Sequence, residues 1–422
     1  MTAYIRPGPP PSGVLAAPPS KSMAHRAVLC AALAAGESRL TGLAHSQDID
    51  ATLAAAAALG AQVKAGESWA RIAGAAPLQA PAAPVDCCES GSTLRFLIPL
   101  AALTGRPVAF TGRGRLMQRP QSVYQELFAS QGLRFEQEGD TLTVAGPLRP
   151  GCLTLAGDVS SQFVSGLLFA LPLLEGDSQL RLLPPVESRS YIEMTRAAQS
   201  RFGVASQWLD ENTLAIPGGQ AYRPRDMAIE GDWSQAAFPA VLGALAGDVT
   251  VTGLEPGTLQ GDAVILDILR RCGGRAEPVP GGVRFQKSAL CGTEIDLADC
   301  PDLGPVLMAM GLLCEGETVI FNAGRLRLKE SDRIAAMEQE LRKLGGRIES
   351  CGGTVTLRRS ALHPPAGPLW GHNDHRVVMS LTVLAAAAGL PVQIDGAEAV
   401  AKSWPGFFAA VRQLGVEVET DA

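Results

Sequence analysis

The chain has 422 residues, of which 46% are hydrophobic and 18% charged, a profile typical of a globular protein with two domains. Its formal net charge of -6 argues against long-range attraction to nucleic acid or to an anionic membrane. Nine cysteines without a CxxC pair, no leader-like N-terminus and no long apolar run predict a cytoplasmic protein with free thiols and no membrane span.

An apolar segment with a polar start recurs six times along the chain, first in the stretch SKSMAHRAVLCAALAAG. Each copy begins near a small polar or acidic residue and ends at a glycine about 13 to 15 residues later. The segments are apolar on every side, so they predict buried helices. The expected N-terminal caps lie near Ser22, Ser92, Ser161, Ser234, Asp302 and Asp374.

A second helix is expected in each repeat, ending at a glycine and followed by a strand-like segment such as RIES or VEVE. Both glycine series keep a spacing of roughly 70 residues, which predicts repeated α/β units in two symmetric domains. Chance periodicity of alternating helices and strands does not explain two series in register. The second series comprises Gly60, Gly132, Gly203, Gly273, Gly345 and Gly415.

Basic residues gather where these helices begin. The first helix starts with Lys21, Ser22 and Arg26, although acidic residues suit the positive end of a helix dipole. Lys and Arg are the usual ligands of phosphate and carboxylate groups, so their matching positions predict anion sites better than solvated surface charge does. The other members of the set are Arg95, Arg119, Lys329, Arg333, Arg376 and Lys402.

Three carboxylates lie among these cations: Asp302, Glu330 and Asp374. Nearby positive charge favours the ionised form, so the cluster supplies a general base more readily than an acid. Helix capping is the alternative role for Asp302 and Asp374. His372 and His375 lack a third ligand nearby, and GRGRLM matches no nucleotide-binding pattern, so neither a metal nor a nucleotide is expected.

Motifs in the right order over the whole chain are similar to those of the 5-enolpyruvylshikimate-3-phosphate (EPSP) synthase family. They are PPSKSMAHR, ESGSTLRF, QRP, VSSQFVSGLL, ESRSYIEMT, EGDWS, LQGD, CPDLGPVLMA, RLKESDRIAAM, NDHRVVM and AKSWPGF. The resemblance implies a two-domain enolpyruvyl transferase fold with six βαβαββ repeats, three per domain, around a central interdomain cleft. The expected domains are residues 1–19 with 230–422, carrying the phosphoenolpyruvate side, and residues 20–229, carrying the shikimate side.

The resemblance also implies a reaction. Phosphoenolpyruvate would donate its carboxyvinyl group to the 5-hydroxyl of shikimate 3-phosphate, releasing phosphate, on the shikimate pathway to chorismate and aromatic amino acids. No metal or organic cofactor is implied. The expected partners are these two small anionic substrates, without nucleic acid or membrane, and the expected state is a monomer.

Roles follow position by position from the same resemblance. Asp302 would accept the proton of the 5-hydroxyl, Glu330 would transfer a proton at the phosphoenolpyruvate methylene, and Lys21 would assist both substrates. The shikimate 3-phosphate ligands would be Lys21, Ser22, Arg26, Ser160, Ser161, Gln162, Ser188, Asp302, Arg325 and Lys329. The phosphoenolpyruvate ligands would be Lys21, Gly91, Arg119, Gln162, Arg333, Arg376 and Lys402.

Two positions depart from the family's commoner pattern: Glu89 stands where Asn is frequent, and Arg325 where Asn or Gln is frequent. Glu89 is expected to pair with a cation such as Arg95 or Lys21, and Arg325 to add a phosphate contact. Gly91 lacks a Cβ, so open space is expected beside it. Glyphosate is an inhibitor that occupies the phosphoenolpyruvate site of this family. The methyl group of alanine at position 91 would be expected to fill that space and crowd the inhibitor.

Two alternatives stay open. One is the enolpyruvyl transferase that acts on UDP-N-acetylglucosamine, but that family carries a reactive Cys where this chain has Gly114, and Lys-Asn where it has Lys21 and Ser22. The other is a non-catalytic protein that binds shikimate phosphate. The intact set of Lys21, Asp302, Glu330 and Lys402 argues against it.

Overall fold

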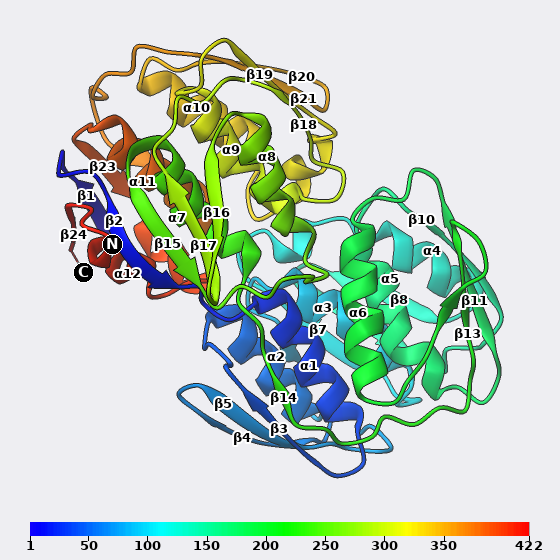
Figure 1. Cartoon of the computed structure of the whole chain (residues 1–422). Coiled ribbons are helices and arrows are strands. Elements are labelled where there is room, and N and C mark those ends of the chain that lie inside the picture. Colours follow the sequence, from blue (N-terminus) through cyan, green and yellow to red (C-terminus); the bar gives the residue numbers. More distant parts are fainter. Residues whose placement is uncertain (422) are drawn as a thin grey trace. The chain divides into compact units, whose positions relative to one another are not determined.

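The computed structural model describes residues 1–421 (Figure 1) and forms two compact units. The discontinuous domain consists of Met1–Pro18 and the residues from Glu230 onward, and the continuous domain is Pro19–Ile229. Each domain has a hydrophobic core of its own, mostly aliphatic, with Phe238 and Leu307 in the first and Phe163 and Leu97 in the second.

The continuous domain contains three four-stranded sheets. Its helices are α1 (Lys21–Leu33), α2 (Gln47–Ala58), α3 (Gly91–Ala102), α4 (Ser122–Ser130), α5 (Ser161–Ala170) and α6 (Arg189–Arg201). Its strands are β3 (Glu37–Thr41), β4 (Gln62–Gly66), β5 (Trp69–Ala73), β6 (Val85–Asp86), β7 (Val108–Thr111), β8 (Arg134–Glu138), β9 (Thr141–Ala145), β10 (Cys152–Ala156), β11 (Ser178–Leu183), β12 (Gln207–Trp208), β13 (Thr213–Ile216) and β14 (Met227–Ala228).

The discontinuous domain also contains three four-stranded sheets. Its helices are α7 (Trp233–Ala246), α8 (Ile265–Arg271), α9 (Gly304–Gly311), α10 (Arg333–Lys343), α11 (His375–Ala388) and α12 (Phe407–Gln413). Its strands are β1 (Thr2–Ile5), β2 (Ser12–Ala16), β15 (Asp248–Thr252), β16 (Arg275–Val279), β17 (Gly282–Gln286), β18 (Glu294–Asp296), β19 (Glu317–Phe321), β20 (Arg347–Cys351), β21 (Thr354–Arg358), β22 (Leu369–Trp370), β23 (Val392–Asp395) and β24 (Val418–Thr420).

All six sheets follow one plan, which confirms the βαβαββ repeat. In the sheet β6-β7-β9-β8, the first two strands are parallel, while β9 pairs antiparallel with both β7 and β8. Strands distant in sequence complete three of the sheets: β14 joins β3, β2 joins β15, and β1 lies between β23 and β24. The N-terminal segment therefore belongs to the discontinuous domain because it supplies strands to two of its sheets.

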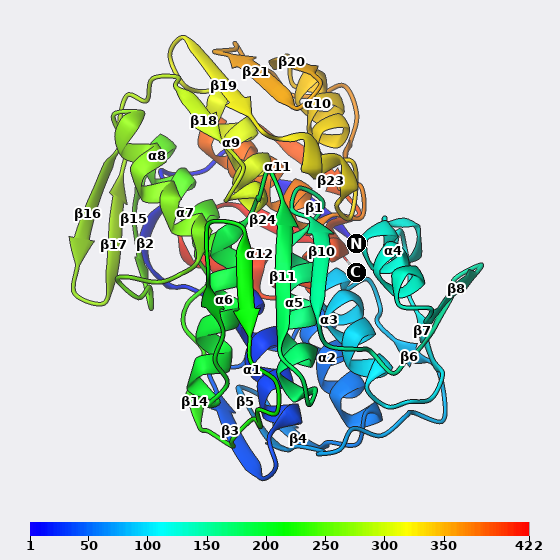
Figure 2. The same cartoon turned by 90° about the vertical axis from the view of Figure 1, so that its right-hand side faces the viewer.

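The first helix of each repeat is buried, as its all-round apolar sequence predicts. Every residue from Trp233 to Ala244 of α7 is buried, for example. The sheets cover the outer sides of these helices: β3 and β5 lie against α1 (Figure 1), and β19 and β21 lie against α9 (Figure 2). Because the first N–H groups of a buried helix have no partner within the helix, polar side chains nearby must accept their hydrogen bonds.

Five of the six predicted caps are present, four of them one or two residues earlier than the predicted positions. Ser20, Ser90, Ser160 and Asp232 accept hydrogen bonds from backbone N–H groups two or three residues ahead, and so does Asp374. The capping role of Asp302 is wrong. This residue lies inside the 3-10 helix Pro301–Leu303, which has no side-chain cap, and its carboxylate binds cations instead.

The second glycine series confirms the predicted helix ends. All six glycines have φ between 68° and 103°, a left-handed conformation that glycine adopts without steric cost. In each case the residue after the glycine donates its N–H to a carbonyl five residues earlier, as Gly346 does to Leu341 at 2.9 Å. This is the Schellman motif. Within residues 1–421, no helix has both the length and the apolar character needed to cross a membrane.

Candidate functional site

A buried network of charged side chains lies where α9, α10 and α11 begin. Its centre is Arg333, the first residue of α10, whose side chain is only 1% exposed. The guanidinium donates to Asp374 from Nε at 2.8 Å, to Asp302 from Nη1 at 3.1 Å and to Glu330 from Nη2 at 2.8 Å. Burial opposes its charge, but the attraction of Asp374, Glu330 and Asp302 outweighs that effect and raises the pKa of Arg333.

Asp302 accepts hydrogen bonds from three cations. Arg376 Nη2 lies 2.9 Å from Oδ2, while Arg333 Nη1 and Lys329 Nζ lie 3.1 and 3.4 Å from Oδ1. Burial by itself would raise the pKa of Asp302, but Arg376, Lys329 and Arg333 hold that pKa well below its usual range. Asp302 is therefore ionised in this cluster.

Lys329 and Arg325 flank this carboxylate on the segment before α10. Burial lowers the pKa of Lys329, and the attraction of Asp302 only partly offsets this effect. Arg325 donates from Nη2 to the carbonyl of Ala298 at 2.5 Å, which places its guanidinium beside the loop that leads to Asp302.

Asp374 links the α10 and α11 starts. It caps α11 through Arg376 N at 2.9 Å and accepts from Ser331 Oγ at 3.0 Å as well as from Arg333. Burial opposes ionisation of Asp374, yet Arg333 lowers its pKa. Its neighbour in the chain, Asn373, accepts from Lys402 Nζ through its carbonyl at 2.6 Å. Capping and charge pairing thus coexist here, and they bring Arg333, Arg376 and Lys402 into one region.

Sequence reasoning missed Asp262 as a part of this region. It lies on the 3-10 helix Gly261–Val264 and accepts a short hydrogen bond from Ser234 Oγ. Burial, assisted by the negative charge of Asp302, raises the pKa of Asp262 to about 6, although Arg376 and Ser234 oppose the shift. The LQGD motif was the available signal, since it ends in this Asp.

In the continuous domain, Lys21 is the first residue of α1, after the cap Ser20. Its Nζ donates to Asp48 Oδ2 on α2 at 2.8 Å. Sequence reasoning did not single out Asp48, which sits in the acidic first turn of α2, where carboxylates are common. The ion pair holds the Lys21 ammonium at the helix start, where Ser20 and not Lys21 provides the cap.

Arg26 lies one turn further along α1 and is 2% exposed. It donates to the carbonyl of Ser22 at 2.7 Å, to Thr195 Oγ1 at 2.8 Å and to the carbonyl of Tyr191 at 2.9 Å. Burial among these neutral partners lowers its pKa to about 10. Arg26 therefore ties the start of α1 to α6.

Gly91 begins α3 and lies against two other predicted ligands. A Cβ at this position would be 2.9 Å from Arg119 Nη1 and 3.3 Å from Gln162 Oε1. The expectation of open space beside Gly91 is therefore wrong, because both side chains already occupy it. Gln162 in turn accepts from Arg95 Nη1 at 2.9 Å and donates to Ser92 Oγ at 3.0 Å. Gly91 at the start of α3 and Gln162 at the start of α5 thus lie beside Arg119, which follows the 3-10 helix Leu116–Gln118.

The predicted serine ligands lie at the starts of α5 and α6. Ser160 caps α5 by accepting from Gln162 N at 3.3 Å, and Ser161 is the first residue of the same helix. Ser188 precedes α6 with φ 55°, a left-handed conformation that a residue other than glycine adopts at a cost of about 1–3 kcal/mol. That strain fixes the direction in which the chain enters α6.

Glu89 lies against Gly114. A Cβ at Gly114 would be 2.4 Å from Glu89 Oε2, so the Glu89 carboxylate occupies the space that a side chain at 114 would need. Gly114 also has φ 57°, which disfavours a side chain. A side chain at this position would therefore require the Glu89 carboxylate to move.

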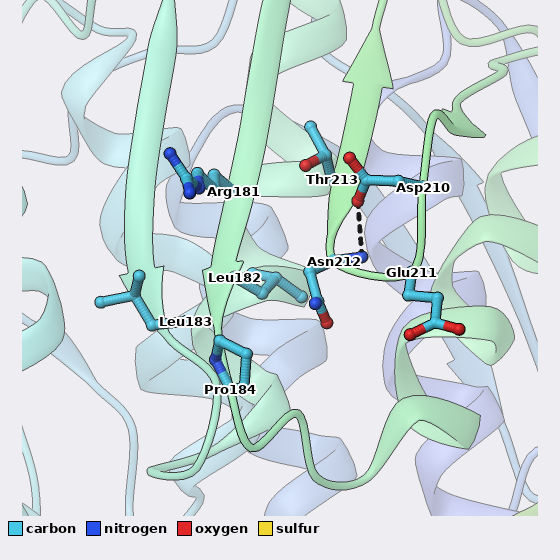
Figure 3. A pocket seen from close by; sticks show the side chains of 8 residues that line it. All are labelled: Arg181, Leu182, Leu183, Pro184, Asp210, Glu211, Asn212 and Thr213. Carbon is cyan, nitrogen blue, oxygen red and sulfur yellow. Dashed lines mark hydrogen bonds between the residues drawn. The ribbon is translucent and has the colours of Figure 1, made fainter.

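Two further kinds of site could lie among the described residues: a metal site and a surface pocket. Residues 1–421 contain no group of three or more His, Cys, Asp or Glu side chains placed to hold a metal ion. A surface pocket lies beside β11 and β13 (Figure 3), where Asp210 accepts from Asn212 N at 2.8 Å. Its lining includes none of the predicted site residues; it is formed by Arg181, Leu182, Leu183, Pro184, Asp210, Glu211, Asn212 and Thr213.

Comparisons with known proteins agree over the length of the chain. A family model described as EPSP synthase (3-phosphoshikimate 1-carboxyvinyltransferase) matches residues 5–411. A 3-phosphoshikimate 1-carboxyvinyltransferase of Clostridium kluyveri is 41% identical, and one of Clostridium beijerinckii 40% identical, each over 96% of this chain and 96% or 95% of the relative.

Solved structures show the same architecture. An EPSP synthase from Acinetobacter baumannii superposes with a TM-score of 0.80 at 25% identity, covering 99% of this chain and all of that one. The enolpyruvyl transferase NikO from Streptomyces tendae has a TM-score of 0.78 at 16% identity, over 99% of this chain and 98% of its own. At that identity the second likeness concerns the fold alone.

Proposed function

The chain belongs to the EPSP synthase family, and on that premise we propose that it transfers the carboxyvinyl group of phosphoenolpyruvate to the 5-hydroxyl of shikimate 3-phosphate. The products are 5-enolpyruvylshikimate 3-phosphate and phosphate. The observation that carries the proposal is the ionised Asp302 carboxylate held by Arg333, Arg376 and Lys329. Such a cluster offers one base surrounded by cations, which suits two anionic substrates.

We propose that Asp302 accepts the proton of the attacking hydroxyl. In the ligand-free cluster its low pKa makes it a weak base. Phosphate and carboxylate groups of the substrates would compete for Arg376 and Lys329, and each cation they draw off raises the basicity of Asp302. The base is therefore expected to gain strength when both substrates are bound.

Glu330 is proposed to handle the second proton. Protonation of the phosphoenolpyruvate methylene carbon builds positive charge on the neighbouring carbon, which the 5-hydroxyl oxygen then attacks. Glu330 in its protonated form would supply the methylene proton, and its carboxylate would then take one proton back from the new methyl group, which restores the double bond as phosphate leaves. The hydroxyl proton taken by Asp302 leaves with the phosphate, so protons balance over the reaction. Arg333 Nη2 holds the Glu330 carboxylate at 2.8 Å, which fixes its position. Fixed charges of this kind stabilise charge that develops during reaction.

The ligand sets follow the two domains. In the discontinuous domain, Arg333, Arg376 and Lys402 are proposed to bind phosphoenolpyruvate, and Asp302, Arg325 and Lys329 to face shikimate 3-phosphate. In the continuous domain, the proposed phosphoenolpyruvate ligands are Lys21, Gly91, Arg119 and Gln162, and those of shikimate 3-phosphate are Lys21, Ser22, Ser160, Ser161, Gln162 and Ser188. Arg26, which also donates to the Ser22 carbonyl, is proposed as a further ligand of shikimate 3-phosphate. A monomer in the cytoplasm remains the expected state.

Phosphate release from phosphoenolpyruvate tests the function directly. Release should require shikimate 3-phosphate, and mass spectrometry should find the carboxyvinyl ether as the second product. UDP-N-acetylglucosamine should not replace the acceptor, because this chain has Gly114 where that family carries its reactive Cys. Binding of shikimate 3-phosphate without turnover would instead indicate the non-catalytic alternative.

A further inference from the structure

A tight turn precedes α11 and carries unusual backbone geometry. Asp374 N donates to the carbonyl of Gly371 at 2.9 Å, so residues 371–374 form a β-turn. Both central residues, His372 and Asn373, have φ of 51°. Positive φ at both positions is the mark of a type I′ turn, a conformation that is uncommon for residues other than glycine, although Asn and His adopt it more often than most. A contact from outside the turn would stabilise His372 in this conformation further.

This turn sets the geometry of two proposed phosphoenolpyruvate ligands. The carbonyl of Asn373 accepts from Lys402 Nζ at 2.6 Å, and the backbone orientation of the turn decides where that carbonyl points. The turn ends at Asp374, which caps α11 through Arg376 N and binds Arg333. A change in the turn would therefore move the anchor of Lys402 and the start of the helix that carries Arg376.

The contact that holds the turn comes from Glu340, two turns along α10 from Arg333. Its side chain is fully buried, and it accepts from His372 Nε2 at 3.0 Å and from Trp370 N at 2.9 Å. Lys343 Nζ adds a third bond at 2.7 Å. Burial opposes its ionisation, but the bonds from His372 and Lys343 lower the pKa of Glu340. One carboxylate thus holds both the strand before the turn and the residue inside it.

We propose that Glu340 is a positioning residue for the phosphoenolpyruvate site: it holds the left-handed His372–Asn373 turn and thereby places Lys402 and Arg376. The proposal rests on the proposed function, because phosphoenolpyruvate is the ligand whose binding it should affect. Glu340 itself contacts no substrate. Its substitution should weaken phosphoenolpyruvate binding and leave the acceptor site intact.

The test compares Glu340→Gln with a matched control, Glu338→Gln. Glu338 lies on the same helix, binds Arg342 and Ser350, and has no contact with the turn. Glu340→Gln should raise KM for phosphoenolpyruvate roughly tenfold, the weight of one hydrogen bond to a charged group. Its KM for shikimate 3-phosphate and its kcat should stay within about twofold. The control should match the wild type in all three constants.

A second variant separates positioning from packing. Glycine adopts a left-handed conformation without strain, so His372→Gly should restore much of the phosphoenolpyruvate affinity when added to Glu340→Gln. A loss of thermal stability with equal changes in both KM values, or a double variant no better than Glu340→Gln, would overturn the proposal. An inactive wild type would instead refute the proposed function, and an active wild type with an unchanged Glu340→Gln would refute only this inference.

Discussion

The two domains share one repeat, yet each treats its most buried arginine differently. In the discontinuous domain Arg333 contacts three carboxylates, which raise its pKa against the effect of burial. In the continuous domain the hydrogen bonds of Arg26 go to hydroxyl and carbonyl oxygens, its guanidinium lies over the rings of Phe96 and Tyr191, and burial lowers its pKa to about 10. Arg333 is therefore part of an ionic network, whereas Arg26 joins two helices through hydrogen bonds to neutral groups.

This difference distinguishes a group of charged side chains that can exchange protons from a set of contacts that only holds two helices together. In the network around Arg333, each charge controls the protonation of its neighbours, so a ligand that binds one member alters the others. The hydroxyl and carbonyl partners of Arg26 do not titrate, so they cannot exchange protons with it as the carboxylates around Arg333 can. Four experiments use this contrast, from the largest expected effect to the smallest.

Replacing each of the two arginines should give the largest difference between the domains, measured as loss of folding free energy. Arg333→Met leaves Asp374 buried without its cation, so the free energy of unfolding should fall by about 3–5 kcal/mol. Arg26→Met leaves only neutral acceptors and should cost about 1–3 kcal/mol. Chemical denaturation of both variants measures the contrast. Equal losses would show that the carboxylates around Arg333 contribute nothing beyond ordinary hydrogen bonds.

Asp262 is a carboxylate of the same domain that accepts a hydrogen bond from the neutral hydroxyl of Ser234, and its pKa can be tested through the pH dependence of stability. Its pKa is raised to about 6, so its protonated form stabilises the fold below about pH 4, and that contribution is lost as pH rises towards 6. Asp262→Asn cannot titrate. Between pH 4 and 7 the free energy of unfolding of the wild type should fall by roughly 3 kcal/mol relative to this variant. A pH-independent difference between the two proteins would contradict the raised pKa.

Asp302→Asn tests the base within the ionic network. The amide keeps the size of the side chain but cannot accept the hydroxyl proton, so phosphate release should slow by roughly 100-fold or more. Substrate affinities should change less than turnover. Asp267→Asn, which alters an exposed ion pair on α8, is the matched control. Near wild-type turnover in Asp302→Asn would remove this residue from the mechanism.

Gly91→Ala should have the smallest effect and should be confined to the continuous domain. The added Cβ meets Arg119 Nη1 at 2.9 Å, so the guanidinium must shift and KM for phosphoenolpyruvate should rise about tenfold. Thermal stability should change little, because the nearest atoms are ends of flexible side chains. Gly367→Ala is the control, since nothing lies within 4 Å of its Cβ. An unchanged KM would show that Arg119 takes no part in binding.

The ends and burial of the helices followed from local sequence. The six glycines of the second series required a left-handed residue at each helix end, and the apolar sequences of α1 and α7 required burial on every side. Both are properties of a short segment, so they could be predicted without knowing the partners. The family motifs likewise pointed to the cations and to Asp302, because each motif is contiguous.

Only the tertiary structure decided which of these residues meet. By sequence Asp302 was as good a candidate for a helix cap as Asp374. Its carboxylate instead accepts hydrogen bonds from Arg333 and Arg376, which lie 31 and 74 residues away along the chain. The contacts of Asp48 with Lys21 and of Glu340 with His372 join helices and turns that no local pattern pairs. Charge pairing depends on distance in space, and packing of the buried helices sets that distance, whereas capping and turn formation depend on a few consecutive residues.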